Sequence, residues 1–170
     1  MSKLKTLATF VTNDAHHDLF RKGNLVEEWS RMYPMLFDAQ DTKIALNQRH
    51  LGYHYHEWLA AILLYHTKGL LSLVEAYAYK SHRLKRKILE TLITGEALDF
   101  IASRGISSVT QCPDLLLYTP DRSEWFFCEV KGPRDKLQET QIDLFQELER
   151  VSGKRINVVH FISTYEVNLA

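Results

Sequence analysis

An apolar stretch of the sequence ends in two opposite charges separated by a single residue. The run WFFC, residues 125–128, leads directly into Glu129, and Lys131 follows two positions later. In a β-strand, residues two apart point to the same face, so a carboxylate and an ammonium leave the end of this run side by side. Buried charges are costly unless they are paired or bind a cation. We therefore expect these two residues to belong to a site.

A second carboxylate stands at the start of an earlier apolar run. Asp114 opens the run DLLLYT, residues 114–119, and a turn-rich linker separates it from the run at 124–130. Two short apolar runs joined by such a linker predict a β-hairpin. In this hairpin Asp114 and Glu129 can lie opposite each other, with Lys131 on the same side. The hairpin would then bring two carboxylates and one ammonium to one edge.

Two carboxylates beside a lysine are suited to the metal-dependent hydrolysis of phosphodiesters. Mg²⁺ is bound through oxygen atoms, often those of one or two carboxylates, and it keeps several waters. A bound cation offsets charge on the phosphate and lowers the pKa of a water ligand, while a nearby ammonium stabilises developing negative charge. Glu-x-Lys alone is too common to indicate this chemistry. Its position after a hairpin strand and before a helix gives it weight.

The hairpin and the residues that follow it resemble a known nuclease pattern. CPDLLLY, from residue 112, and WFFCEVKGPRDKLQETQ, from residue 125, are similar to the PD-(D/E)xK nuclease superfamily, and more narrowly to the virus-type replication-repair nuclease (VRR-NUC) domain. The resemblance implies an α/β fold: a restriction-endonuclease-like core with a small mixed sheet flanked by helices. It also implies that Asp114, Glu129 and the carbonyl of Val130 bind Mg²⁺ or Mn²⁺, and that Lys131 serves catalysis.

The same family uses an acidic residue on a helix ahead of the sheet. We expect Glu57, at the start of an amphipathic helix at 56–69, to take this place, and Glu75 in LSLVEAY is the alternative. Further along the chain, Gln141 shares a helical face with apolar residues and so points inward. Its amide is expected either to orient Lys131 or a water in catalysis, or to be a satisfied core glutamine.

Net charge gives no sign of a nucleic-acid partner, because 21 basic residues are balanced by 21 acidic ones. DNA would therefore be held by a local patch. KSHRLKRK, residues 80–87, is the densest cationic stretch. On a helix Leu84 is expected to face inward and the basic residues outward, either as a solvated face or in contact with phosphates. The nucleic-acid candidates are Arg83, Lys85, Arg86, Lys87, Arg134 and Lys136.

Histidines offer an alternative metal site. Those near the predicted helix at 56–69 are His50, His54, His56 and His66. The spacing at 54 and 56 suits a strand, but structural zinc sites usually show tighter Cys/His signatures. One of these two histidines could instead contact the phosphate or Glu57. The two cysteines, Cys112 and Cys128, lie against apolar runs and are expected to be buried reduced thiols.

The elements that position these residues change character near residue 110, with helical periodicity before it and strand patterns after it. The predicted helices cover residues 24–33, 56–69, 81–93, 94–105 and 135–153. The predicted strands cover residues 114–119, 124–130 and 155–163. Several helices followed by strand, strand, helix and strand indicate an α/β layer fold. We expect residues 1–50 to form a mostly helical extension and residues 51–170 to form the nuclease domain, as one compact unit.

The expected function is that of a Mg²⁺- or Mn²⁺-dependent endonuclease acting on duplex or branched DNA. No DNA-reading module accompanies the domain, so selectivity for DNA structure is expected. The alternative is a catalytically inactive DNA-binding protein on a nuclease fold. The family serves DNA repair, phage replication or antibacterial killing, and a secreted toxin would have a cognate immunity protein. No apolar run reaches the ~18 residues of a membrane span, and no signal peptide is visible. We therefore expect a cytoplasmic location, or delivery into a target cell's cytoplasm.

Overall fold

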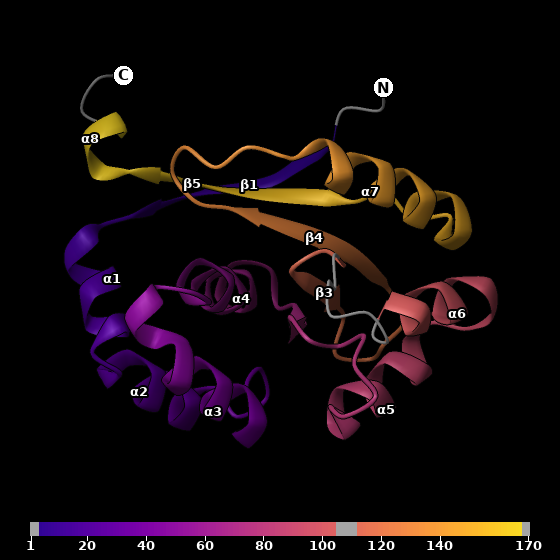
Figure 1. Ribbon diagram of the computed structural model, residues 1–170, viewed down its shortest axis with the longest axis horizontal. Coiled ribbons are helices and arrows are strands. Elements are labelled where there is room, and N and C mark those ends of the chain that lie inside the picture. Colours follow the sequence, from indigo (N-terminus) through magenta and orange to yellow (C-terminus); the bar gives the residue numbers. More distant parts are fainter. Residues whose placement is uncertain (1–3, 105–111, 168–170) are drawn as a thin grey trace.

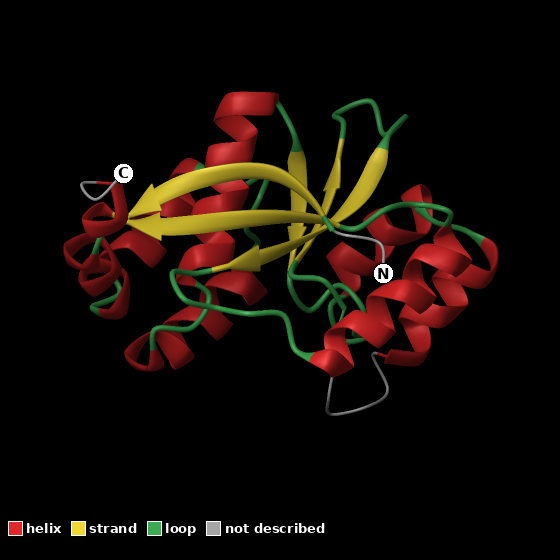
Figure 2. Ribbon diagram, turned by 90° about the horizontal axis from the view of Figure 1, so that it is seen from above, coloured by secondary structure: helices red, strands yellow, loops and turns green. Residues whose placement is uncertain are grey.

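Five strands form one mixed sheet in the part of the chain that the structure describes. The computed structural model describes residues 4–104 and 112–167. The strands are β1 (Lys5–Thr12), β2 (Leu71–Val74), β3 (Leu115–Tyr118), β4 (Trp125–Lys131) and β5 (Asn157–Ser163). Their order across the sheet is β1-β5-β4-β3-β2, and Figure 2 shows the strands in yellow with helices around them. The first and the last of these strands in sequence are therefore neighbours.

The pairing within the sheet changes from parallel to antiparallel at β4. β1 and β4 run parallel to β5, whereas β3 runs antiparallel to both β4 and β2. The register pairs Leu115 of β3 with the last residue of β2 and with Cys128 of β4. One residue further along, Asp114 therefore lies between Glu75 and Glu129. Strand pairing alone thus gathers three acidic residues at one end of three adjacent strands.

Helices cover both faces of the sheet, as Figure 1 shows. They are α1 (Asp14–Arg21), α2 (Asn24–Met32), α3 (Ala39–Gln48), the 3₁₀ turn η1 (Arg49–Leu51), α4 (Tyr55–Lys68), α5 (Arg83–Leu92), α6 (Gly95–Arg104), α7 (Glu139–Ser152) and α8 (Thr164–Val167). One buried core joins α1–α4 to sheet residues such as Leu117 and Cys128, and the other joins α5–α7 to residues such as Leu116 and Phe127. Alternate strand residues thus face opposite cores. None of the helices in the described ranges is long and apolar enough to cross a membrane.

The elements predicted around the hairpin are confirmed. The runs at 114–119 and 124–130 form β3 and β4, and the helix predicted at 56–69 forms α4. α4 ends where its sequence predicts, because Gly69 adopts a left-handed φ of 66° that favours glycine. The strand predicted at 155–163 forms β5. The helix that carries Glu57 and the strands that flank Asp114 are therefore in place.

Helices α5 and α6 form inside the predicted ranges 81–93 and 94–105, of which residue 105 lies outside the described part. The N-cap of α5 is His82, which makes no side-chain capping bond. The helix predicted at 135–153 begins later, at Glu139, because Gln138 and Gln141 form the capping box. The first residues of these helices are therefore Arg83 in α5 and Glu139 in α7.

The prediction of a mostly helical extension at residues 1–50 leaves out a strand. β1 pairs with β5 along its whole length, and residues of α1–α3 share a core with α4 and the sheet. The sequence KTLATFVT does not alternate regularly between apolar and polar residues, so period-two patterning did not reveal it. β2 was also missed, because its four residues are too short for a periodic signal.

Candidate active site

Three carboxylates from three different elements converge at this end of the sheet. Glu57 lies in the first turn of α4, Glu75 directly follows β2, and Asp114 directly precedes β3. Each offers an oxygen atom within 4.8 Å of the oxygens offered by the other two. The structure therefore brings together both residues that the sequence presented as alternatives for the helix acid. We call Glu57, Glu75 and Asp114 the carboxylate group.

Backbone hydrogen bonds hold this group across three strands. The N–H of Glu75 donates to the carbonyl of Asp114 at 2.7 Å. The N–H of Val130 donates to Oδ2 of Asp114 at 2.8 Å. Asp114 is thus attached to the residue after β2 and to β4 at once. Its carboxylate has little freedom to leave the group.

Burial and the proximity of the three carboxylates raise the pKa of two of them. Burial, followed by the charge of Glu75, raises the pKa of Glu57 to about 8. Burial, followed by the charges of Glu129, Glu57 and Glu75, raises the pKa of Asp114 well above its usual range. Like charges brought close together in a desolvated place cannot all ionise unless a cation compensates them. An oxygen-only donor set of this kind fits a hard divalent cation such as Mg²⁺ or Mn²⁺.

A second cluster surrounds the ammonium of Lys131. Nζ of Lys131 donates to Oε1 of Glu129 at 2.6 Å, and both residues are buried. The amide of Gln141 donates to the same Oε1 at 2.8 Å, and its Oε1 accepts from Lys131 at 3.3 Å. The amide therefore points to the sheet and contacts Lys131, as its place on the helical face predicts. A catalytic role for Gln141 stays a prediction.

Glu129 lies opposite Asp114 but is not a member of the carboxylate group. Its Oε1 is engaged by Lys131 and Gln141, and Val130 contributes its N–H to Asp114. Cation binding by Glu129 and by the Val130 carbonyl stays a prediction. Glu129 instead forms an ion pair with Lys131.

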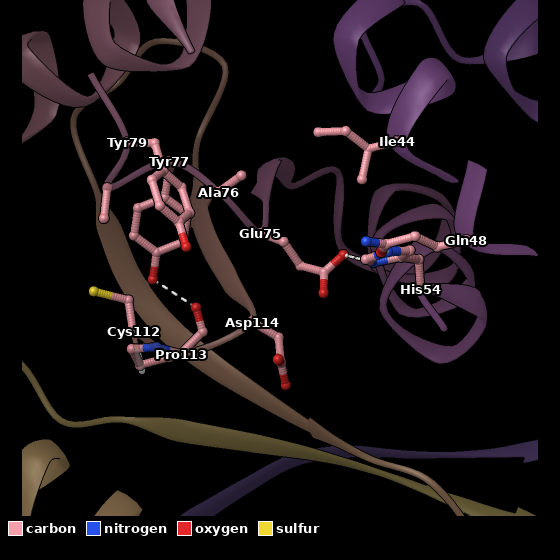
Figure 3. Close-up of a pocket in the computed structure, with 11 residues that line it drawn as sticks. Ile44, Gln48, His54, Glu75, Ala76, Tyr77, Tyr79, Cys112, Pro113 and Asp114 are labelled. Carbon is pink, nitrogen blue, oxygen red and sulfur yellow. Dashed lines mark hydrogen bonds and ion pairs between the residues drawn. The ribbon is translucent and has the colours of Figure 1, made fainter. Parts of the chain in front are cut away.

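His54 is a residue of the site whose partner the sequence did not reveal. It precedes α4 with a left-handed φ of 73°, and its Nδ1 contacts the carboxylate of Glu75. Its Nε2 lies 2.5 Å from Oε1 of Gln48. Burial lowers the pKa of His54, but the hydrogen bond and the charge of Glu75 outweigh burial and raise that pKa above its usual value. The expected partner was Glu57 or a phosphate, and the partner found is Glu75, as Figure 3 shows.

Among the described residues, neither group of possible metal ligands contains His50, His54, His56 or His66. His54 and His56 lie at the start of α4 and not on a strand, and His66 is exposed and contacts Tyr33. Within the described ranges, the histidine that joins a candidate cation group is His82, with Asp38 and Asp41.

The cysteines are both free, and burial raises the pKa of the half-buried Cys112 thiol to about 12.

Cavities open on both sides of Asp114. One, of about 320 Å³, is lined by Glu75, His54 and Tyr77 among others, and Figure 3 shows Tyr77 donating its hydroxyl to the carbonyl of Pro113 at 2.6 Å. The other, of about 300 Å³, is lined by Lys131, Lys136, Gln138 and Gln141. Asp114 lines both cavities, and the second contains Asp135 as well as its two lysines.

The nucleic-acid candidates on α5 need one correction. Leu84 was expected to face inward but is 60% exposed, and Lys85 was expected to face solvent but is only 3% exposed. Lys85 is buried because Asp41 and two backbone carbonyls accept its protons. It does not face a DNA ligand. Arg86 is half-buried and pairs with Glu90 at 2.8 Å. The remaining candidates, Arg83, Lys87, Arg134 and Lys136, are exposed.

The comparison with protein families agrees with this geometry. The model of the VRR-NUC domain matches residues 53–161, from the start of α4 to the middle of β5. No curated protein matches the chain. The matched segment contains the whole carboxylate group as well as Glu129, Lys131 and Gln141.

Proposed function

The chain belongs to the VRR-NUC domain family and is a nuclease with a PD-(D/E)xK-like fold; from this premise we propose that it is a Mg²⁺- or Mn²⁺-dependent endonuclease selective for DNA structure. The observation that carries the proposal is the carboxylate group beside the Lys131 ammonium. Burial and the neighbouring carboxylates raise the pKa of Glu57 and Asp114, and Asp114 lines a cavity that also contains Lys131 and Lys136.

Different residues of the site are proposed to bind the cation and to contact the phosphate. Glu57, Glu75 and Asp114 would hold the cation, with Glu129 and the Val130 carbonyl as further proposed ligands. When bound, the cation offsets charge on the phosphate and lowers the pKa of water. The Lys131 ammonium donates hydrogen bonds to the developing negative charge. Glu129 and Gln141 hold that ammonium in place, and Gln141 thereby serves catalysis.

The substrate is proposed to be duplex or branched DNA in the cytoplasm. The exposed basic residues Arg134 and Lys136 directly follow β4, and Arg83 and Lys87 add a second cationic surface. Selectivity for DNA structure is tested with one sequence presented as single strand, duplex, flap and four-way junction. Equal rates on all four would contradict it.

Cleavage with and without metal tests the enzyme itself. Purified protein is expected to cut DNA with Mg²⁺ or Mn²⁺ and to stop in EDTA. Lys131→Ala is expected to slow cleavage by at least about 100-fold, because an ammonium at the reacting phosphate is lost. Lys43→Met, an exposed lysine of α3, serves as the control and should cut normally. DNA binding without cleavage under any metal would instead identify an inactive DNA-binding protein.

A growth experiment distinguishes a role in antibacterial killing from the other two roles. A secreted toxin of this family would act in a target cell's cytoplasm and would be neutralised by a cognate immunity protein. Expression in the bacterial cytoplasm should then arrest growth, and the product of the neighbouring reading frame should relieve the arrest. Normal growth with active protein would favour DNA repair or phage replication.

A further inference from the structure

A buried ammonium lies behind the carboxylate group. Lys85 of α5 is 3% exposed and Asp41 of α3 is 7% exposed, and Nζ of Lys85 lies 2.5 Å from Oδ1 of Asp41. The same Nζ donates to the carbonyl of Val74 and, at 3.0 Å, to the carbonyl of Glu75. All three protons of the ammonium therefore have acceptors, and two of these acceptors are backbone atoms at the end of β2.

The second of these carbonyls belongs to a strained piece of backbone that begins directly after Val74. Glu75 and Ala76 both have a φ of 47°, a left-handed conformation that residues other than glycine rarely adopt. Such strain persists only where the surroundings over-determine the conformation. Here the N–H of Glu75 donates to Asp114 and its carbonyl accepts from Lys85. The bend is thus held from both of its sides.

The bend determines where the carboxylate of Glu75 lies. β2 ends at Val74, and a chain that continued straight would follow the sheet edge and not turn at Glu75. The bent backbone presents Glu75 to Glu57 and Asp114 within 4.8 Å. Lys85 donates to the backbone of Glu75 and not to its carboxylate, which contacts His54. Lys85 therefore acts on the position of this acid without neutralising it.

In the neighbouring group of Asp38, Asp41 and His82, the Asp41 carboxylate is already paired with a cationic side chain. The Lys85 ammonium already stands at Oδ1 of Asp41, which also lies 3.4 Å from Nε2 of His82. Burial raises the pKa of the Asp41 carboxyl, but contacts with His82 and Lys85 outweigh burial and hold that pKa below its usual range. Asp41 is therefore a compensated carboxylate whose partner is Lys85.

We propose that Lys85 is a positioning residue for the cation site: its ammonium, anchored by Asp41, holds the left-handed bend at Glu75 and Ala76 and so places the Glu75 carboxylate beside Glu57 and Asp114. This inference rests on the proposed cation-dependent function. It assigns to Lys85 a task other than DNA contact, and it links α3 and α5 to the site through one buried side chain.

Calorimetric titration of metal-free protein with Mn²⁺ tests this assignment without requiring cleavage. Lys85→Met is expected to weaken Mn²⁺ binding by about 10- to 100-fold, as changes behind metal ligands do. Lys43→Met removes an exposed lysine near Asp41 and should bind Mn²⁺ like the unaltered protein. In cleavage assays, Lys85→Met should need more Mn²⁺ yet show an unchanged KM for DNA. Unchanged Mn²⁺ affinity, or a raised KM for DNA at saturating Mn²⁺, would overturn the proposal.

A second variant keeps the test valid if Lys85→Met fails to fold, since it leaves Asp41 buried without a counter-charge. Lys85→Met combined with Asp41→Asn removes both charges, and replacing a whole buried ion pair is often tolerated. This double variant should fold and still bind Mn²⁺ weakly, whereas binding at full affinity would refute the positioning role. Mn²⁺ binding by the unaltered protein without any cleavage would count against the proposed function alone.

Discussion

At the scale of single residues, the site is defined by acids that cannot all be charged. Glu57 faces Glu75 and Asp114 across distances within 4.8 Å, and burial removes the water that would otherwise screen their repulsion. The pKa of Glu57 is consequently raised to about 8. The folded protein therefore keeps a proton at neutral pH that the unfolded chain releases.

This proton makes the stability of the metal-free protein depend on pH. Between pH 4.5 and about 8 the folded state binds the Glu57 proton while the unfolded state loses it. The stability contributed by the protonated acid is complete below 4.5 and is lost as the pH rises through the folded pKa. We expect the melting temperature of metal-free protein to fall with pH across this window more steeply than that of Glu57→Gln. Melting curves of both proteins at several pH values, in EDTA, measure the difference.

Two results would speak against this explanation. Parallel pH profiles for the unaltered protein and Glu57→Gln would mean that Glu57 titrates normally in the folded state. A steeper fall for the variant would mean that the sign of the shift is reversed. Saturating Mn²⁺ should raise the melting temperature of the unaltered protein most at high pH, because the cation competes with the proton.

At the scale of elements, the site depends on how α7 meets β4. The capping box of Gln138 and Gln141 begins α7 at Glu139, so Gln141 lies in the first turn of the helix. Its amide then contacts both Glu129 and Lys131. The sequence predicts that this helix begins at residue 135, whereas the capping box begins it at Glu139.

Loss of this helix-to-strand contact should slow catalysis more than it affects folding. Gln141→Leu keeps the size of the side chain but removes one acceptor of Lys131, one donor to Glu129 and the acceptor of the Gln138 N–H in the capping box. We expect kcat to fall by about 10- to 100-fold, the usual effect of a residue that orients a catalytic group. Gln146→Leu changes an exposed glutamine of the same helix and is the control. Steady-state rates and melting curves of both variants provide the comparison, and a normal kcat in Gln141→Leu would leave Gln141 as a core glutamine.

At the scale of the whole molecule, the two faces of the sheet supply different parts of the site. Glu57 comes from α4, which shares a core with α1–α3, whereas Gln141 comes from α7 and the core on the other face. Asp114 stands between the two cavities at the sheet end. Lys136 lines the cavity that contains Lys131. A DNA strand whose phosphate reaches Lys131 would therefore pass close to Lys136.

The position of each cavity predicts how much each cationic residue contributes to DNA binding. Lys136→Ala is expected to weaken DNA binding and to reduce the slope of log K against log salt by about 1, the effect of one lost phosphate contact. Lys87→Ala should have a smaller effect, because Lys87 lines a different cavity, beside Leu84 and Ile88. Binding of fluorescent DNA at several salt concentrations measures both. A larger loss for Lys87→Ala would move the DNA path onto α5.

Local pattern determined the catalytic hairpin. Two short apolar runs joined by a turn-rich linker are a local signal, so the sequence alone predicted that Asp114 and Glu129 lie opposite and that Lys131 shares a side with Glu129. The helix of Glu57 was equally clear, since its apolar spacing and Gly69 are local signals. The match of the VRR-NUC domain to residues 53–161 confirms the family that these motifs indicate.

Contacts between distant residues decided the rest. In the sequence, Lys85 is one of several cations on a basic helix. Its ammonium can be buried because it is paired with Asp41, 44 residues earlier, and donates to backbone carbonyls at the end of β2. β1 becomes a strand through its pairing with β5 at the far end of the chain. Glu75 lies beside Glu57 because the backbone bends at Glu75 and Ala76. Neither residue is a glycine, so the local sequence does not predict this bend. Burial of a charge and strain in a backbone are both stabilised by partners elsewhere in the chain, and only the folded structure shows which partners those are.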